Sequence, residues 1–186
     1  MSQADQLKQL KQEILDKNVC ADLARTAKQL VIGDGNPGAD IIFIGEAPGA
    51  EEDKQGLPFV GRAGQFLNDM LQLINLSRAD VYITNIVKYR PPNNRDPSDE
   101  EKAEFLPYLF KQIAIIKPKV IVTLGRHSME AFLPGFRISQ IHGQPKRKHG
   151  LVYMPLYHPA AALYNGGMRD TLIEDFKKIP KIIEQL

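Results

Sequence analysis

Short apolar runs that alternate with helical patterns are the feature that most constrains how this chain can fold. Each of four such runs has the length of a buried strand. They span residues 41–44, 81–84, 120–124 and 152–156. Apolar residues at helical spacing lie between and after them, at 63–74, 99–116, 128–132 and 169–183. Because strands that alternate with helices pair in parallel through right-handed crossovers, we predict an α/β fold, a three-layer α/β/α sandwich with a central four-stranded parallel sheet.

The length of the chain bounds its domain organisation. Its 186 residues, 43% of them hydrophobic, suit one domain with a core of ordinary size. Helical spacing of apolar residues near the N-terminus predicts an amphipathic helix over residues 2–17. Its apolar stripe consists of Leu7, Leu10, Ile14 and Leu15. We therefore expect one domain over residues 1–186, with a helical segment, 1–30, packed on it.

Charge and cysteine content exclude several classes of protein. The 24 Lys and Arg residues against 22 Asp and Glu give a net charge of only +2, so any nucleic-acid surface must be a local patch. Cys20 is the single cysteine, which excludes an internal disulfide and cannot alone hold a metal or cluster. The N-terminus lacks the apolar stretch of a signal peptide, and no run approaches the roughly 18 apolar residues of a membrane helix. We expect a soluble, cytoplasmic protein.

Unusual residues follow the C-terminal ends of the predicted strands, where open α/β sheets bind their ligands. The first strand is followed by GEAPG at 45–49, the second by NIVKYRPPNNR at 85–95, and the fourth by HPAAAL at 158–163. The carboxyl ends of parallel strands lie at the same edge of a sheet. These three segments should therefore converge on one site.

Four motifs occur in order along the chain: GEAPGAEED, LPFVGRAG, TNIVKYRPPNNRDP and HPAAAL. In this combination the chain resembles the family 4 uracil-DNA glycosylases of the uracil-DNA glycosylase superfamily, from about Val31 to the C-terminus. The resemblance implies an enzyme of base excision repair that flips uracil out of DNA and hydrolyses its N-glycosidic bond, which gives free uracil and an abasic site. No lysine is among the residues expected at the base, so we expect a monofunctional glycosylase without a lyase step.

A flipped base is recognised by stacking and by hydrogen bonds to its edge. Phe59 matches the family position that stacks on uracil, although from the residue alone it could simply cap the core. Asn85 ends a predicted strand, where its carboxamide can accept from a ring NH and donate to a carbonyl oxygen, a pattern that cytosine does not offer. The alternative is an asparagine that ties the loop backbone together. Ala47 is the third expected uracil contact, through the backbone NH groups around it.

Two side chains are expected to carry the chemistry. By resemblance, His158 donates to the uracil oxygen that gains negative charge, and a neutral imidazole would serve; alternatively it only caps the helix after Pro159. Glu46 matches the family glutamate and could orient water, stabilise the positively charged sugar, or accept from loop amides. Ala47 stands where the best-known branch has a water-positioning aspartate, so the water activator stays open. Asn94 matches a further family asparagine, although Pro-Asn-Asn also favours a turn.

Basic side chains beside the pocket are expected to bind DNA phosphates in a salt-dependent manner. They are Lys88, Arg90, Arg95 and Arg169, with Lys146–His149 as the weakest candidate. Leu163 resembles the leucine that glycosylases insert into the base stack, and Tyr164 is its rival.

The chain departs from family 4 at the iron–sulfur site. Family members typically hold a [4Fe-4S] cluster through four cysteines, and the matching positions here are Asn18, Ala21, Tyr89 and Glu104. None of them can be a thiolate ligand, and Cys20 is out of register. We expect no cofactor and no metal, with Tyr89 filling the space by packing.

Two other classes of function stay open at this stage. A module that binds uracil-containing or single-stranded DNA without turnover would show salt-dependent binding and no release of base. A small-molecule enzyme could use the same pocket for nucleosides or nucleotides, but the proline- and arginine-rich loop at 90–95 argues against it. For the favoured hypothesis the partner is uracil-containing DNA, single- or double-stranded. The protein is expected to be a nucleoid-associated monomer without membrane contact.

Overall fold

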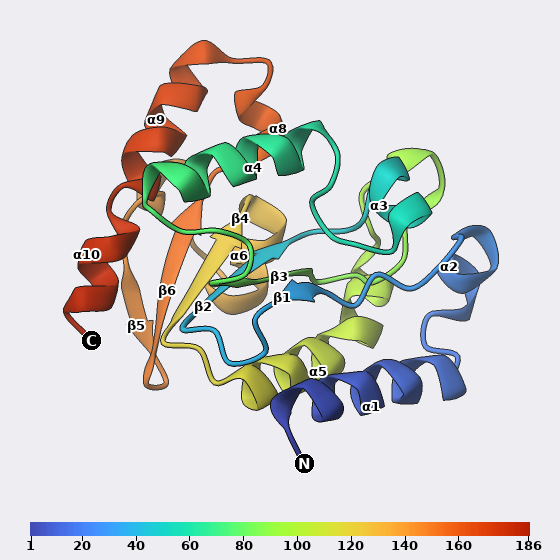
Figure 1. Ribbon diagram of the computed structural model, residues 1–186. Coiled ribbons are helices and arrows are strands. Elements are labelled where there is room, and N and C mark those ends of the chain that lie inside the picture. The colour runs from blue at the N-terminus through green and yellow to red at the C-terminus, as the bar shows by residue number, and fades with distance from the viewer.

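The structure is a computed structural model that describes residues Met1–Leu186, and its centre is a six-stranded sheet (Figure 1). The strand order is β1-β3-β2-β4-β6-β5. The strands are β1 (Asp34–Gly35), β2 (Ile41–Gly45), β3 (Tyr82–Asn85), β4 (Val120–Leu124), β5 (Lys146–Lys148) and β6 (Leu151–Leu156). The four predicted runs form the parallel strands β2, β3, β4 and β6, whereas β1 and β5 pair antiparallel with β3 and β6. The predicted fold class is confirmed, and the sheet has two more strands than the four expected.

The parallel strands are buried on both faces because alternate residues pack against different helical layers. In β2, Ile42 and Ile44 belong to one apolar cluster and Ile41 and Phe43 to the other. A strand covered on both faces is apolar at every position, which made these four strands readable from the sequence. The edge strands β1 and β5 are short and polar, with the sequences DG and KRK, and carry no such signal.

Helices cover both faces of the sheet. They are α1 (Gln3–Asp16), α2 (Ala21–Thr26), α3 (Ala50–Gln55), α4 (Arg62–Leu73), α5 (Asp99–Ile116), α6 (Arg126–Phe132), α7 (Ile138–Ile141), α8 (Pro159–Ala162), α9 (Gly166–Phe176) and α10 (Ile179–Glu184). A 3-10 turn, η1, spans Pro92–Asn94. Helices α1, α5 and α6 pack on one face, and α4, α9 and α10 on the other (Figure 1). The helix expected over 169–183 is two helices, α9 and α10.

The N-terminal helix α1 packs against α5 through an apolar stripe. Leu7, Leu10 and Ile14 are buried in the cluster on that face, and Gln3 donates to the carbonyl of Ile115 at 2.9 Å. Leu15, which we predicted to be in the stripe, is 42% exposed, since it lies one residue beyond the face that meets α5.

The topology creates a crevice at the carboxyl end of β2. The chain passes from β2 to β3 on one side and then returns to β4 on the other side of β2. Where the strand order reverses in this way, the loops that leave the strands diverge and make room for a ligand. None of the helices is both long and apolar enough to cross a bilayer.

Candidate active site

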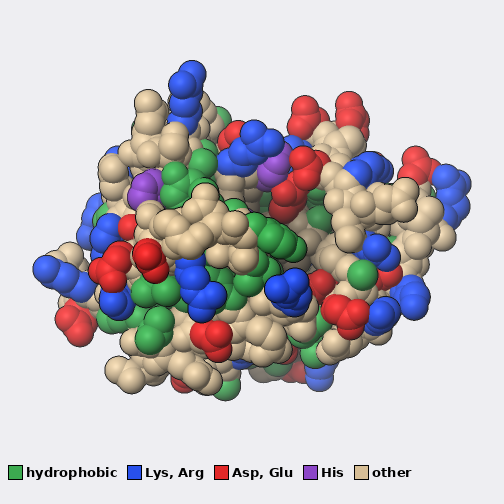
Figure 2. All heavy atoms as spheres, turned by 90° about the horizontal axis from the view of Figure 1, so that it is seen from above, with side chains coloured by type: hydrophobic (Ala, Val, Ile, Leu, Met, Phe, Trp, Pro, Cys, Tyr) green, Lys and Arg blue, Asp and Glu red, His purple; other side chains and the backbone are tan.

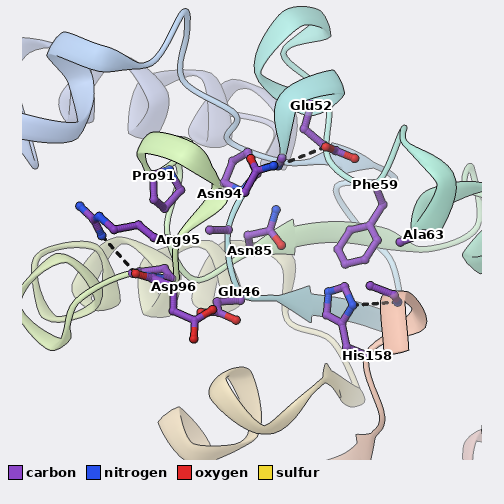
Figure 3. Close-up of a pocket in the computed structure, with 15 residues that line it drawn as sticks. Glu46, Glu52, Phe59, Ala63, Asn85, Pro91, Asn94, Arg95, Asp96 and His158 are labelled. Carbon is purple, nitrogen blue, oxygen red and sulfur yellow. Dashed lines mark hydrogen bonds between the residues drawn. The ribbon is translucent and has the colours of Figure 1, made fainter. Parts of the chain in front are cut away.

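A pocket of about 310 Å³ lies at the carboxyl ends of the parallel strands, which is a size suited to a small ligand. Its lining includes seven residues singled out from the sequence: Glu46, Ala47, Phe59, Asn85, Asn94, Arg95 and His158. They come from the loops after β2, β3 and β6 and from the segment before α4 (Figure 3). The expected convergence of these segments is therefore observed. The molecule seen from above carries basic and acidic side chains intermixed rather than one broad basic patch (Figure 2).

Asn85 ends β3 with a buried side chain, only 2% exposed, that lines the pocket. Its carboxamide makes no hydrogen bond within the protein, whereas its backbone carbonyl accepts from Lys88 at 2.6 Å and, more weakly, from the Thr84 hydroxyl at 3.5 Å. A buried amide without a partner is costly unless a ligand or water completes it. An asparagine that tied the loop backbone together would use its carboxamide for that purpose, and Asn85 does not. Its carboxamide is therefore free to bind a ligand.

Phe59 forms the aromatic wall of the pocket and is held in a left-handed backbone conformation, with φ of 50°. Its ring stacks beside that of His158, with the centroids 5.6 Å apart. Gly45 makes this approach feasible: a Cβ there would lie 2.4 Å from Asn85 Oδ1 and 2.7 Å from the Phe59 ring. Phe59 also packs on the core cluster of α4, so it caps the core and faces the pocket at once.

His158 uses its two ring nitrogens differently. Its Nδ1 accepts from the backbone NH of Ala160 at 3.0 Å and so caps α8. This contact leaves the proton on Nε2, which has no partner in the protein and can donate into the pocket. Burial lowers the pKa of His158 to about 4, the neighbouring His127 acts in the same direction, and Glu52 opposes them. The imidazole is therefore neutral at pH 7, and the two interpretations of His158, helix cap and ligand donor, are compatible.

Glu46 follows β2 and faces the pocket with an unsatisfied oxygen. Its Oε1 is buried without a hydrogen-bond partner, and its Oε2 lies 3.8 Å from His127 Nε2. Asp96 Oδ2 lies 3.6 Å from the same nitrogen. Burial raises the pKa of Glu46; His127 opposes this shift, and Asp96 adds to it. His127, at the start of α6 after β4, was not identified from the sequence.

Glu52 joins the two loops that flank the pocket, and it was also missed by sequence reasoning. Its Oε2 accepts from the backbone NH of Gly49, and its Oε1 accepts from those of Val60 and Gly61, at 2.9–3.1 Å. The contact to Gly49 is a capping-box contact at the start of α3. A carboxylate at the third residue of a helix is a common signal, so the sequence did not reveal its contacts with the second loop.

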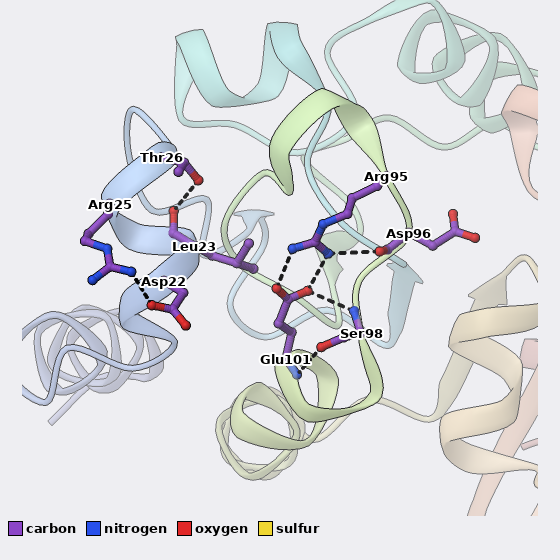
Figure 4. A network of polar contacts seen from close by, with 8 residues as sticks. All are labelled: Asp22, Leu23, Arg25, Thr26, Arg95, Asp96, Ser98 and Glu101. Carbon is purple, nitrogen blue, oxygen red and sulfur yellow. Dashed lines mark hydrogen bonds and ion pairs between the residues drawn. The ribbon is translucent and has the colours of Figure 1, made fainter.

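The loop after β3 is a tight turn that brings Asn94 to the pocket. Asn93 and Asn94 both have positive φ, and Asn94 Oδ1 accepts from Arg90 Nε at 2.8 Å. Arg95 forms a two-pronged ion pair with Glu101, with distances of 2.7 and 2.9 Å, and donates to the carbonyl of Asp96 (Figure 4). Its charge is thus largely committed to α5, whereas that of Arg90 has no acidic partner.

Lys88 does not lie on the surface, and the expected phosphate contact is wrong for this residue. Its side chain is 0% exposed, and its ammonium donates to three neighbouring oxygens. The spacing in the motif placed it next to Arg90 but could not reveal that its side chain points inward, against α5.

The other residues expected to contact DNA differ in their exposure and in their position relative to the pocket. Leu163 is half-buried against the apolar cluster of α4 and α9, whereas Tyr164 beside it is 82% exposed. Arg169 is exposed, with its guanidinium 4.5 Å from the centre of the Phe66 ring. The Lys146–His149 cluster forms β5 and its turn into β6, at the end of the sheet opposite to the pocket. That position argues against a DNA contact shared with the pocket.

The four positions that match the family's cluster ligands do not fit a [4Fe-4S] cluster. Tyr89 is buried and packs edge-on against Phe105, with the ring centroids 5.9 Å apart. Glu104 accepts from the backbone NH of Cys20 at 2.8 Å. Burial, with a smaller contribution from Glu104, raises the pKa of the Cys20 thiol to about 11, so the one sulfur nearby is not a thiolate.

Comparison with known proteins gives a consistent result. The family model described as the uracil DNA glycosylase superfamily matches residues 32–184. The chain is 46% identical to the type-4 uracil-DNA glycosylase of Sulfurisphaera tokodaii, over 96% of this chain and 85% of that protein. It is 42% identical to that of Archaeoglobus fulgidus, over 96% and 94%. For the Thermotoga maritima protein of the same description the identity is 39%, over 97% of both chains.

Proposed function

The chain belongs to the type-4 uracil-DNA glycosylases of the uracil DNA glycosylase superfamily, and we propose that it excises uracil from DNA with the pocket described above. The reaction hydrolyses the N-glycosidic bond and yields free uracil and an abasic site, the first step of base excision repair. One observation carries the assignment of the site: the buried Asn85 carboxamide lacks a protein partner and shares its pocket with an aromatic wall and a neutral imidazole donor.

Recognition of the base rests on Phe59, Asn85 and the turn after β2. Uracil stacks on the Phe59 ring, while the Asn85 carboxamide accepts from the ring NH and donates to an adjacent carbonyl oxygen. Cytosine reverses this pattern of donors and acceptors at the same edge, so it would leave the buried amide unsatisfied. The backbone around Ala47 lines the same wall and supplies further contacts.

His158 stabilises the leaving base. When the bond between C1′ and N1 breaks, its electron pair passes to uracil, and negative charge spreads to the carbonyl oxygens. A neutral Nε2–H donor aimed at one of these oxygens stabilises that charge more in the transition state than in the ground state. The backbone NH of Ala160 holds the ring in the required tautomer.

Glu46 acts on the sugar side. Its unpartnered Oε1 can accept from a water molecule whose oxygen then bonds to C1′, and the carboxylate also faces the positive charge of an oxocarbenium-like sugar. Asn94, at the rim of the pocket, is a further candidate contact for this water or for the sugar. Glu46 takes the proton that this water loses as its oxygen bonds to C1′, and the uracil anion gains a proton on release, so the products are neutral uracil and an abasic sugar.

DNA is held by a small number of cations and one wedge. Arg90 and Arg169, neither of which has an acidic partner, are the proposed phosphate contacts, while Arg95 would first have to leave Glu101. Between the two wedge candidates, the exposure of Tyr164 favours it over Leu163, which anchors the loop in the core. Either single- or double-stranded DNA can present a flipped uracil to this pocket.

We further propose that the protein works as a monomer, without a cofactor and without a lyase step. The cluster positions offer no thiolate, and the single lysine of the loop after β3, Lys88, is buried and cannot reach a sugar aldehyde. The DNA substrate places the activity at the nucleoid, in the cytoplasm.

A labelled oligonucleotide with one uracil tests the proposal. The protein is incubated with it in EDTA, next to a thymine control, and alkali then reveals abasic sites. We expect uracil-dependent cleavage that is lost in His158→Ala and Asn85→Ala. Salt-dependent binding without cleavage would instead support a binding module, and release of base only from a free nucleoside would support a small-molecule enzyme.

A further inference from the structure

Lys88 is a buried cation directly behind the pocket. Its side chain is 0% exposed, although lysine is among the residues least often buried. Its Nζ donates to Thr84 Oγ1 at 2.7 Å, to the Asn85 carbonyl oxygen at 2.6 Å and to Gln112 Oε1 at 2.5 Å. The mechanism derived above does not use it.

The three contacts favour the protonated form of the Lys88 side chain. The Thr84 hydroxyl donates to the carbonyl of Ile32 at 2.8 Å, and Gln112 Nε2 donates to the same carbonyl at 2.8 Å. Both side chains therefore turn acceptor atoms toward Lys88. Three acceptors match the three hydrogens of an ammonium, whereas a neutral amine has only two.

The charge has no acidic counter-ion. All three contacts are neutral oxygens, and burial alone lowers the pKa of the Lys88 ammonium, with no carboxylate raising it. In a dry interior the field of an unpaired charge extends further than it does in water. The geometry opposes this cost of burial: each of the three hydrogens of an ammonium has an acceptor, so the contacts favour the charged form.

The charge lies on the far side of Asn85 from the pocket. The Asn85 carbonyl accepts from Lys88, while the Asn85 carboxamide lines the pocket. The next two residues are fixed as well: Ile86 N donates to the Gly45 carbonyl and Val87 N to that of Glu46, both at 3.0 Å. One short segment thus holds the cation, the amide and the backbone of Glu46 in a constant arrangement.

We propose that Lys88 stabilises, through space and across Asn85, the negative charge that develops on uracil as the glycosidic bond breaks. This inference rests on the proposed glycosylase function and adds to it a second source of leaving-group stabilisation, behind the direct donor His158. A fixed charge in a water-excluded site needs no reorganisation when the reaction charge appears. Lys88 does not contact the base and acts only on its negative charge. Its contribution to the excision rate should therefore be larger for a base that leaves as a less stable anion.

Leaving-group chemistry separates this role from a structural one. Single-turnover excision is measured for uracil and for 5-fluorouracil in otherwise identical oligonucleotides, with wild type and Lys88→Met. The fluorine withdraws electrons, so 5-fluorouracil leaves as a more stable anion and needs less help. We expect roughly a tenfold to hundredfold slower excision of uracil in the variant, and a clearly smaller loss for 5-fluorouracil. An equal loss for both bases, or no loss, would overturn the proposal.

A second variant keeps the lysine and the packing. Gln112→Glu places a carboxylate on the ammonium and cancels its field, so it should show the same bias between the two bases even where Lys88→Met folds poorly. Lys119→Met is the matched control, because Lys119 is half-exposed, pairs with Asp40 and precedes β4 at the opposite end of the sheet. We expect wild-type rates for it with both bases. Uracil excision by the wild type is checked first, so a failure of the proposed function is distinguishable from a failure of this inference.

Discussion

At the scale of single residues, the site combines polar groups that have hydrogen-bond partners within the protein with polar groups that have none. His158 has one nitrogen occupied by Ala160 and one free, and the Asn85 carboxamide is buried without any internal partner. Folded proteins rarely leave buried polar groups unsatisfied, and such groups are found where a ligand completes them. The free atoms thus mark the side of each residue that is available for the base.

Asn85→Ala should lower kcat/KM by about 10²- to 10³-fold, because it removes hydrogen bonds that only the substrate completes. The stability of the fold should change by less than about 1 kcal/mol, since the carboxamide has no internal hydrogen bond to lose. Steady-state kinetics and urea unfolding check the two parts. Gln72→Ala, an exposed amide on α4, is the control. A large loss of stability with an unchanged kcat/KM would show that Asn85 is structural.

The pH dependence of kcat/KM should report the ionisation of Glu46. Its carboxyl must be ionised to act, and its pKa is raised by burial, so activity should fall as the pH drops through that raised pKa. Asp96 raises this pKa and His127 lowers it. Asp96→Asn should therefore move the acidic limb to lower pH, and His127→Phe should move it to higher pH. Shifts in the opposite directions, or none, would remove Glu46 from the step that limits kcat/KM.

At the scale of elements, the pocket depends on how separate loops are tied together. Glu52 connects the start of α3 with the segment that carries Phe59, through three backbone amides. Arg78 reinforces that segment from the other side by donating to the carbonyls of Pro58 and Phe59, at 2.7 and 3.0 Å. The position of the aromatic wall is thus determined by two side chains from outside its own segment, Glu52 of α3 and Arg78 of the turn before β3.

Glu52→Ala should reduce the unfolding free energy by about 1–3 kcal/mol and raise KM, because three amides lose their acceptor and the Phe59 loop is released. Urea unfolding and steady-state kinetics measure these effects. The neighbouring Glu51→Ala breaks only an exposed ion pair with Lys54 and should be nearly neutral. Equal effects of the two substitutions would contradict the proposed link between the loops.

The elements that could be predicted from the sequence are those with a periodic apolar signal. The four parallel strands were found because both of their faces are buried, and α5 was predicted over its observed span because its apolar residues recur at helical spacing. The capping box that Ser98 and Glu101 form at its start was seen only in the structure. The edge strands β1 and β5 are too short and polar to give such a signal. Lys88 was misplaced for a related reason: residue spacing does not show that a charged side chain has an interior set of acceptors.

At the scale of the whole molecule, apolar packing holds the region around the four positions that match the family's cluster ligands. Tyr89 lies in the same apolar cluster as Cys20, Phe105 and Leu109, which joins the N-terminal helices to α5. A domain of this length can be stable on its core alone. The residues of the candidate site lie at or just after the carboxyl ends of the parallel strands. Their positions relative to one another therefore depend on the pairing of these strands in the sheet.

Tyr89→Ala should cost about 3–5 kcal/mol of unfolding free energy, because it opens a cavity in this cluster. Tyr89→Phe should cost less than about 1 kcal/mol, since no hydrogen bond from the Tyr89 side chain is present. Thermal or urea unfolding distinguishes the two. A large loss in Tyr89→Phe would mean that the hydroxyl, rather than ring packing, supports the region.

The central claim is that this chain turns over uracil in DNA without a cluster. The most direct measurement is the amount of free uracil released, by chromatography, from an excess of uracil-containing oligonucleotide in EDTA, with iron determined in the same preparation. We predict several moles of uracil per mole of protein, none of thymine from the control, and iron far below one equivalent. Tight, salt-dependent binding with no release of uracil, or activity that follows the iron content, would contradict the account.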